Sequence, residues 1–305
     1  MTAIELINSN YSVIIIVMYL FVIGFEHLAI RYLGVKGSIE HKEASMNVLV
    51  GLSSFPINAI FAFLTFGALF WAKEYQIISL PITFYTLIVC FILDDLRFYI
   101  HHRICHRFRW MWGMHVVHHS SERFSLDVAG RQGWTKHFTG TMMLKVPLVL
   151  IGFDPLLVIF CGVINAAYQF FLHTEAIGKL PRWYEFIFNT PSHHRVHHGK
   201  NPKYLDANYA GSLIIWDRMF GSFVEEDLND QPDFGLVEPI RTYNPFKILF
   251  FEYVRIFQDI FSPGLSIKER VLYLFGPPGW SHDGTRKMST DIKHLDNNKI
   301  INRKT

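Results

Sequence analysis

Long runs of apolar residues dominate the first 172 positions of the chain, and polar residues interrupt them at only a few points. A helix needs about 20 mainly apolar residues to cross a bilayer. Three runs meet that requirement, and we predict a spanning helix in each: residues 11–30, 46–71 and 76–93. No Lys or Arg precedes the first run, so we expect it to persist as a span and not to be removed as a signal peptide.

A fourth apolar stretch, residues 139–172, is too long for one span and too short for two perpendicular ones. Its middle holds Gly152-Phe153-Asp154-Pro155, a sequence typical of a break between helices. We therefore predict a helical hairpin that dips into the membrane, turns at these residues and returns. Further on, residues 246–261 place apolar and charged side chains at helical spacing, which is typical of a helix on the membrane surface.

Basic residues lie mostly on one side of these predicted spans. They follow the first span, the third span and the hairpin, whereas Lys73 is the single basic residue between the second and third spans. Lys and Arg are enriched in cytoplasmic loops, so this side is expected to face the cytosol. The prediction is an all-α, polytopic membrane protein with about three spanning helices, a helical hairpin and a cytosolic, histidine-rich helical cap. The expected membrane is the bacterial inner membrane or the endoplasmic reticulum.

We expect one integral membrane unit over residues 1–305, with its catalytic region at residues 91–245 and a polar tail at residues 277–305. The composition agrees, because 50% of the 305 residues are apolar and 18% are charged, against roughly a quarter charged in soluble domains. A net charge of +3 indicates no nucleic-acid partner. The three cysteines form no CxxC pair, which argues against a zinc ribbon or a redox dithiol.

Histidine is the one polar residue type in excess. Of the 16 His, ten fall in the two short windows 101–119 and 193–198, at spacings that place them on shared helix faces. Imidazole is a ligand for iron, zinc, copper and nickel. The histidines at helical spacing are the expected metal ligands: His102, His106, His115, His118, His119, His194, His197 and His198. Eight ligands exceed the four of one zinc ion and suit two metals with open positions.

Two further histidines are candidate ligands by their place in the chain. His173 closes the apolar hairpin, and His193 adjoins the last set. A helix that continues from the third span would lift His102 about 13 Å beyond Leu93, just above the hydrocarbon. Thr190, Pro191 and Gly199 are typical start and stop residues for a short helix that carries the last set.

Polar residues near the histidine sets are candidates for orienting the ligands. A metal-bound His usually donates its other ring N–H to a carboxylate or a carbonyl. We expect such supporting roles at six positions: Asp95, Tyr99, Glu122, Asp206, Asn208 and Asp217.

The residues leave three function classes open. An oxygen-activating enzyme with two metals fits the histidine number best. A membrane zinc hydrolase is less well supported, because HExxH is absent and Glu26-His27 has the reverse order. A metal carrier or metal-binding receptor is the third class. The chain has no GxGxxG, P-loop or CxxCH motif, so an enzyme of the first class needs an external electron donor.

The ordered histidine pattern resembles the fatty acid hydroxylase (sterol desaturase) superfamily of membrane di-iron enzymes. The matching residues are Asp95-x-x-x-Tyr99-x-x-His102-Arg103-x-x-His106, then His115-x-x-His118-His119, then His194-x-x-His197-His198. Further segments are similar to its ether-lipid-cleaving branch, the alkylglycerol monooxygenases: HVVHHSSERFSL, Arg131-Gln132, YQFFLHTE and the long segment that begins NTPSHHRVHH.

This resemblance implies two iron ions, O2, a lipid substrate from the bilayer and an external electron donor. For the ether-lipid branch it implies hydroxylation of the alkyl carbon next to the ether oxygen, with tetrahydrobiopterin as reductant. Two positions differ from that branch: Arg107 stands where an acid is expected, and Gly130 where a leucine is expected. The alternative is a sterol or fatty acyl hydroxylase or desaturase that takes electrons from a cytochrome or ferredoxin.

Overall fold

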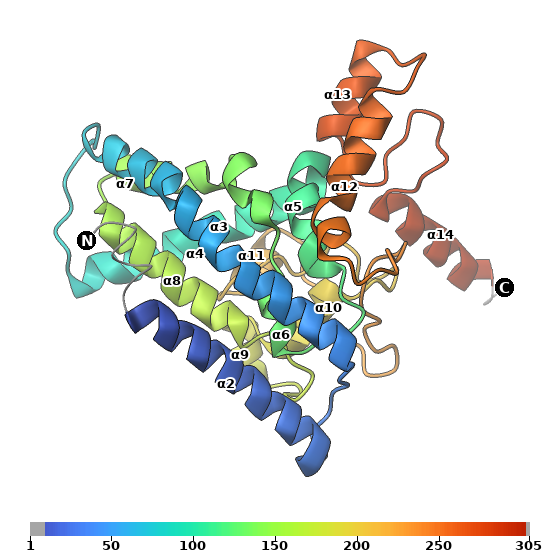
Figure 1. Cartoon of the computed structure of the whole chain (residues 1–305), viewed down its shortest axis with the longest axis horizontal. Coiled ribbons are helices and arrows are strands. Elements are labelled where there is room, and N and C mark those ends of the chain that lie inside the picture. Colours follow the sequence, from blue (N-terminus) through green and yellow to red (C-terminus); the bar gives the residue numbers. More distant parts are fainter. Residues whose placement is uncertain (1–9, 303–305) are drawn as a thin grey trace.

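A computed structural model describes residues 10–302, and every regular element in that range is a helix (Figure 1). The predicted all-helical class is therefore confirmed. Two isolated backbone bridges, Phe188 with Leu213 and Gly199 with Phe234, are the extended pairings among these residues. The segment on which the signal-peptide expectation rests, residues 1–9, lies outside the described residues, as do residues 303–305 of the predicted polar tail.

Two of the three predicted spans are long apolar helices. Helix α2 (Asn10–Leu33) covers the first predicted span, and α3 (His41–Lys73) covers the second and runs through Pro56. Within the described chain these two helices are long and apolar enough to cross a membrane. Figure 1 shows α2 and α3 beside α8 in one bundle. The number of spans beyond these two remains a prediction.

The third predicted span begins later and extends further than the apolar run. Helix α4 (Phe84–Arg107) starts eight residues after the predicted position, where Thr83 and Thr86 form a reciprocal cap. The chain before it is held in a non-helical link, because the Gln76 amide donates to the carbonyls of Val149 and Phe153. As predicted, α4 continues beyond Leu93 and carries His102 and His106.

The predicted break in the apolar hairpin is confirmed. Helices α7 (Val146–Leu150) and α8 (Pro155–Phe170) are separated at the expected residues, and the Asp154 carboxylate caps α8 at the Leu156 amide. Gly152 has φ of +126°, and a Cβ there would lie within 2.8 Å of Ile78. Preceding α7 is a short 3₁₀ helix, η2 (Thr141–Lys145). Entry of this hairpin into the membrane remains a prediction.

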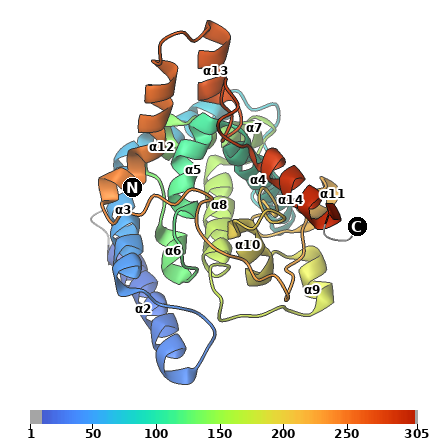
Figure 2. The same cartoon turned by 90° about the vertical axis from the view of Figure 1, so that its right-hand side faces the viewer.

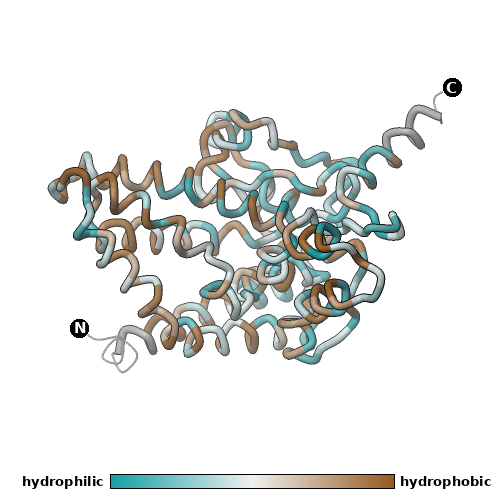
Figure 3. The backbone as a smooth tube through the Cα atoms, turned by 90° about the horizontal axis from the view of Figure 1, so that it is seen from above, coloured by the Kyte–Doolittle hydropathy of each residue, from teal (hydrophilic) through white to brown (hydrophobic). Residues whose placement is uncertain are grey.

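Shorter helices form the polar half of the molecule. Figure 3 shows hydrophobic residues concentrated where the long helices lie and hydrophilic residues towards the opposite end. The short helices there are α5 (Arg109–His119), α6 (Leu126–Gly130), η1 (Trp134–Phe138), α9 (Arg182–Ile187), α10 (Pro191–His198) and α11 (Ile215–Met219). Helices α4, α5 and α10 carry nine of the ten predicted ligands, all except His173.

Three helices complete the chain. Helices α12 (Pro245–Ile260) and α13 (Ile267–Phe275) form a hairpin, and both Figures 1 and 2 show it projecting from the rest of the molecule. The amphipathic helix predicted at residues 246–261 corresponds to α12. The predicted polar tail contains α14 (Ser289–Asn302), which lies near the short polar helices in Figure 2.

Candidate metal centre

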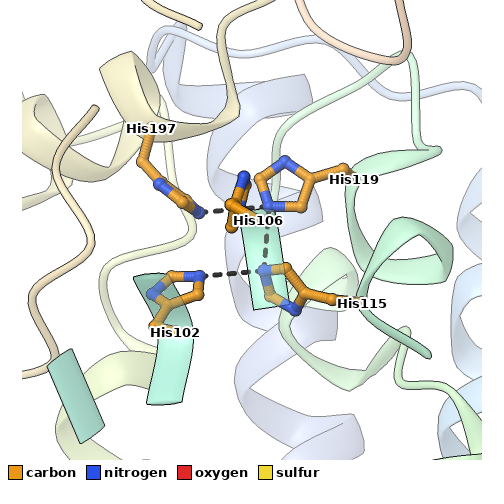
Figure 4. A group of neighbouring side chains, drawn as sticks. All are labelled: His102, His106, His115, His119 and His197. Carbon is orange, nitrogen blue, oxygen red and sulfur yellow. Dashed lines mark hydrogen bonds between the residues drawn. The ribbon is translucent and has the colours of Figure 1, made fainter. Parts of the chain in front are cut away.

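Nine of the ten candidate histidines gather in two adjacent groups. In each group the potential ligand atoms all lie within 4.8 Å of one another. The first group is His102, His106, His115, His119 and His197, drawn in Figure 4; the second is His118, His173, His194 and His198. Helices α4, α5 and α10 contribute to the first group, while α5, α10 and the residues after α8 contribute to the second. The groups touch, because the rings of His119 and His198 stack with centroids 4.3 Å apart.

Backbone carbonyls determine which ring nitrogens of His102 and His197 face the other histidines of the first group. The Nδ1 atoms of His102 and His197 lie 2.8 Å from the carbonyl oxygens of Tyr209 and Ala207, respectively. A carbonyl only accepts hydrogen bonds, so both Nδ1 atoms carry the proton and both Nε2 atoms present a bare lone pair. These Nε2 atoms point at His115 and His119, at 2.8 Å and 3.1 Å (Figure 4).

The second group has the same design. His173 donates from Nδ1 to the carbonyl of Gln169 over 2.8 Å. Its bare Nε2 lies 3.0 Å from Nε2 of His118 and 2.9 Å from Nε2 of His194. The three Nε2 atoms cannot all form good hydrogen bonds with one another, because the single lone pair on Nε2 of His173 faces two other rings. A cation bound among them would satisfy all three.

Three more ring nitrogens of the groups are buried without a hydrogen-bond partner: Nε2 of His106 in the first group, and Nδ1 of His194 and Nε2 of His198 in the second. Burial also holds the pKa values of His115, His119, His194 and His198 well below the ordinary value. Their imidazoles are therefore neutral near pH 7, as metal ligation requires. These residues fit two nitrogen-bound transition-metal ions, one in each group.

The last histidine set is presented by the helix that its capping residues predict. Thr190 accepts at its side chain from the His193 amide, Pro191 occupies the first turn, and α10 ends before Gly199. His194, His197 and His198 are all buried on this helix. The start and stop predicted for this helix are confirmed.

The loop after α10 supplies the supporting groups. Asp217 accepts hydrogen bonds from the amides of Tyr209 and Ala210, each over 2.8 Å, and so positions the Tyr209 carbonyl that binds His102. Asp206 contacts a ligand ring directly, because its Oδ1 lies 3.3 Å from Nδ1 of His106. Asp206 and Asn208 both have positive φ, 51° and 54°, which lets this loop turn back over α10.

The other predicted supporting residues bind the scaffold and touch no ligand ring. Asp95 accepts from the Ser212 and Leu213 amides and from the indole of Trp216, which ties α4 to α11. Tyr99 bonds to the Ser222 hydroxyl. The side chain of Glu122 contacts no histidine ring of either group.

Two predicted residues lie beside the last histidine set but outside both groups. Asn208 donates from its amide to the carbonyls of His193 and Val224. The His193 ring lies apart from both groups, 3.9 Å from the Glu185 carboxylate and against the Phe223 ring. We therefore leave His193 out of the proposed ligand set.

Sequence reasoning missed several residues that support the centre. The carbonyls of Gln169, Ala207 and Tyr209 carry no side-chain signal, so no motif reveals them. In the sequence, Arg131 stands out only as part of the Arg131-Gln132 pair. Its guanidinium is buried and donates to the Val117 carbonyl and the Ser120 hydroxyl at the end of α5.

A cavity of about 320 Å³ reaches the histidines from the polar half. His106, His119, His197 and His198 form its floor, and α12, α14 and the loop after α10 form its walls. Charged side chains line the walls: Arg109, Lys200, Asp206, Glu238, Glu252, Arg255, Arg286 and Lys287. A small or polar molecule can therefore reach ligand atoms of both groups through this cavity.

Comparison with known proteins places the centre inside a recognised family region. Residues 87–222 match the family model described as fatty acid hydroxylase. Alkylglycerol monooxygenase of Xenopus tropicalis is 41% identical over 210 residues, 68% of this chain and 46% of that protein. The human protein of the same name is 39% identical over 210 residues, with the same two shares.

A more distant relative is an ornithine lipid hydroxylase of Rhizobium tropici, 27% identical over 180 residues, 57% of this chain and 50% of that protein. The chain spans about half the length of the curated relatives it matches. No solved structure gives a significant match.

Proposed function

We propose that the chain belongs to the fatty acid hydroxylase family, whose model residues 87–222 match, and that it is a membrane-bound di-iron monooxygenase that hydroxylates a lipid C–H bond with O2. The observation that carries the proposal is the pair of histidine groups, five and four strong, whose unprotonated ring nitrogens converge. The first group comprises His102, His106, His115, His119 and His197, and the second His118, His173, His194 and His198.

Two iron ions held by these groups would supply the oxidant that O2 and two electrons generate for cleavage of a C–H bond. The protein's own part is to orient the ligands. Carbonyls of Gln169, Ala207 and Tyr209 hold three rings with Nε2 inward. Asp206 accepts from Nδ1 of His106 when that nitrogen carries the proton. Such outer partners typically change metal affinity by 10–100-fold when they are removed.

The substrate class follows from the location of the centre and from the relatives. Helix α4 runs from an apolar segment to His102 and His106, and the polar cavity reaches the histidines from the polar half. A lipid can therefore place its chain among the helices while polar reactants enter from the water. We propose an ether lipid of the alkylglycerol type, because alkylglycerol monooxygenases are similar to this chain at 39–41% identity over about two thirds of its length.

The proposed reaction balances with one external two-electron donor. One oxygen atom of O2 enters the C–H bond next to the ether oxygen, and the other leaves as water with two electrons and two protons from the donor. The resulting hemiacetal loses the glycerol oxygen as an alcohol and leaves a fatty aldehyde. We propose tetrahydrobiopterin as the donor; the cavity beside His106 and His119 is where a polar reductant of that size would approach.

The proposal includes the membrane orientation that the sequence predicts. Helices α2 and α3 would cross the membrane, and the histidine groups would face the cytosol at its surface. The acid expected after the first histidine box is replaced by Arg107. For this reason the test must distinguish the ether-lipid enzyme from a sterol or fatty acyl hydroxylase that takes electrons from a cytochrome or ferredoxin.

The test uses the full chain in lipid nanodiscs, loaded with ferrous iron. Iron is counted per chain and examined by Mössbauer spectroscopy, and the sample is incubated with an alkylglycerol, a tetrahydropterin and ¹⁸O2. The expected result is two irons per chain and release of ¹⁸O-labelled fatty aldehyde that requires the pterin. Zinc as the bound metal, or one iron in an active sample, would overturn the di-iron proposal. Hydroxylated sterol or acyl product with a ferredoxin donor would replace the ether-lipid substrate.

A further inference from the structure

The hairpin of α12 and α13 lies beyond the family-matched region, residues 87–222, and carries exposed apolar side chains along both helices. On α12 the exposed residues fall within one quarter of the helix circumference, and on α13 they recur every fourth position. They are Phe246, Val254, Phe257 and Phe261, then Ile267, Val271 and Phe275. We call these two rows the apolar stripes.

The stripes are separate from the faces that hold the hairpin to the protein. Ile248, Leu249, Tyr253 and Ile256 are the buried apolar residues of α12. The stripe residues are between 48% and 82% exposed, and the values peak next to the turn, at Phe261 and Ile267. The turn itself, residues 262–266, contains no charged residue. The most apolar surface of the hairpin is therefore its tip, which projects freely in Figures 1 and 2.

The base of the hairpin is attached to a candidate membrane span. Ile248 and Leu249 pack with Val50 of α3, and Met46 borders the same cluster. Helix α3 is about 50 Å long and the hydrocarbon core about 30 Å thick, so about seven residues extend beyond it at each end. Residues 46–50 therefore lie at the level where the hydrocarbon begins, and α12 starts from that level.

An aromatic side chain marks the same boundary. The ring of Trp134 packs edge-on against Phe246 and Phe250, with centroids 6.2 Å apart in both pairs. Trp is enriched where a membrane protein passes through the head-group layer. The apolar stripes thus continue the lipid-facing surface of α3 outward along the membrane boundary.

The charges of the hairpin indicate which kind of membrane surface it fits. Two of its acids, Glu252 and Asp259, pair with the buried Arg109, whereas Glu269 lies at the surface, hydrogen-bonded to Ser266 at the start of α13. The basic residues Lys247 and Lys268 point to solvent and have no acidic partner among the described residues. These two lysines therefore place unpaired positive charge beside the stripes, which complements anionic lipid head groups.

We propose that the α12–α13 hairpin inserts its apolar stripes and tip into the lipid surface of the membrane that α2 and α3 cross. The inference rests on the proposed membrane placement of those two helices. It also gives the cavity a position, because Phe251, Glu252 and Arg255 on another side of α12 line its wall. The mouth of the cavity then opens at head-group level, where the polar end of a lipid lies.

The test measures which solvent surrounds the hairpin in the full-length chain. Single cysteines are introduced as Phe257→Cys, Phe261→Cys and Val271→Cys, spin-labelled, and reconstituted in nanodiscs of phosphatidylcholine and phosphatidylglycerol. Collisions of the label with O2, which concentrates in lipid, are compared with collisions with a water-soluble nickel chelate. The native cysteines are buried, so an unaltered sample treated with label serves as the blank.

Two control positions calibrate the measurement. Phe63→Cys reports the lipid-facing surface of α3, where Phe63 is 60% exposed, and Asn229→Cys reports an exposed position in the segment between α11 and α12. We expect the three hairpin labels to favour O2, as position 63 does, and position 229 to favour nickel. Hairpin labels that match position 229 while position 63 favours O2 would overturn the inference and leave the membrane placement intact.

Two other outcomes would also reject the inference. Nickel preference at position 63 as well would overturn the membrane placement on which it rests. Spectral broadening at position 261 that disappears on dilution with unlabelled protein would show that a second copy of the chain covers the stripes in place of lipid.

Discussion

The guanidinium of Arg131 donates a hydrogen bond to the backbone carbonyl of Val117 over 3.0 Å, at the last turn of α5. The next two residues along the chain are His118 and His119, which belong to different metal-binding groups. The same guanidinium donates to Asn47 of α3 over 2.6 Å. Arg131 therefore connects a candidate membrane span with the point at which the two groups meet.

Arg131→Gln should weaken both the fold and the metal centre. The substitution leaves the Val117 carbonyl and the Asn47 side chain without a charged donor, at a cost of about 2 kcal/mol. We expect a lower melting temperature and less iron per chain after purification. Arg123→Gln is the matched control, because Arg123 contacts Ser38 at the exposed surface. Equal iron content and melting temperature in both variants would contradict the positioning role.

Asp206→Asn should lower metal affinity without unfolding the protein. The Asp206 carboxylate faces Nδ1 of His106, and removal of such a partner typically costs 10–100-fold in affinity. Competition with a chelator of known iron affinity measures the change. Asp233→Asn is the control, since Asp233 pairs with Lys200 at the surface. An unchanged iron affinity in Asp206→Asn would show that this contact does not support the site.

The sequence predicts the histidine groups well because their information is local. Spacings of three and four residues put ligands on one helix face, and Thr190 and Gly199 delimit α10 in the sequence itself. Adjacent residues of a helix point about 100° apart, so His193 is not expected on the face that His194 shares with His197 and His198. The structure places the His193 ring outside both groups.

Other features depend on contacts between distant segments, which spacing does not encode. The uncharged run at residues 76–93 reads as one helix, but Gln76 binds carbonyls of the later hairpin, and the helix itself begins only at the Thr83–Thr86 cap. The carbonyl of Tyr209 becomes a partner of His102 only because Asp217 binds the Tyr209 amide. Tertiary hydrogen bonds of this kind explain why supporting residues were harder to predict than ligands.

A buried ion pair should make stability depend on pH. Arg195 on α10 donates from Nε and Nη2 to the two carboxylate oxygens of Glu226, over 2.8 Å and 2.7 Å. Burial alone would raise the pKa of Glu226, but the hydrogen bonds and charge of Arg195 outweigh it and lower the pKa below the ordinary 4.5. The pair thus stabilises the fold above pH 4.5, and this contribution is lost as the pH falls through the folded-state pKa.

The measurement compares the unaltered chain with Glu226→Gln across this pH range. Near pH 7 the variant should be less stable by about 3 kcal/mol, because Arg195 is left buried without its partner. The stability difference should shrink below pH 4.5, and taking the difference removes the histidine titration common to both chains. Glu225→Gln is the neighbouring control at an exposed pair with Lys179 and should change stability little. A pH-independent difference for Glu226→Gln would refute the assignment.

His118 and His193 provide the sharpest test of the ligand assignment. His118 lies in the second group, with Nε2 3.0 Å from Nε2 of His173, whereas the His193 ring faces Glu185 and Phe223. His118→Ala should abolish iron binding in its group and all turnover, because three histidines with open positions leave a weak site. His193→Ala should keep two irons per chain and its Mössbauer signature, although loss of a buried ring lowers the melting temperature. Retained activity in His118→Ala would refute its ligand role, and loss of one iron in His193→Ala would return His193 to the ligand set.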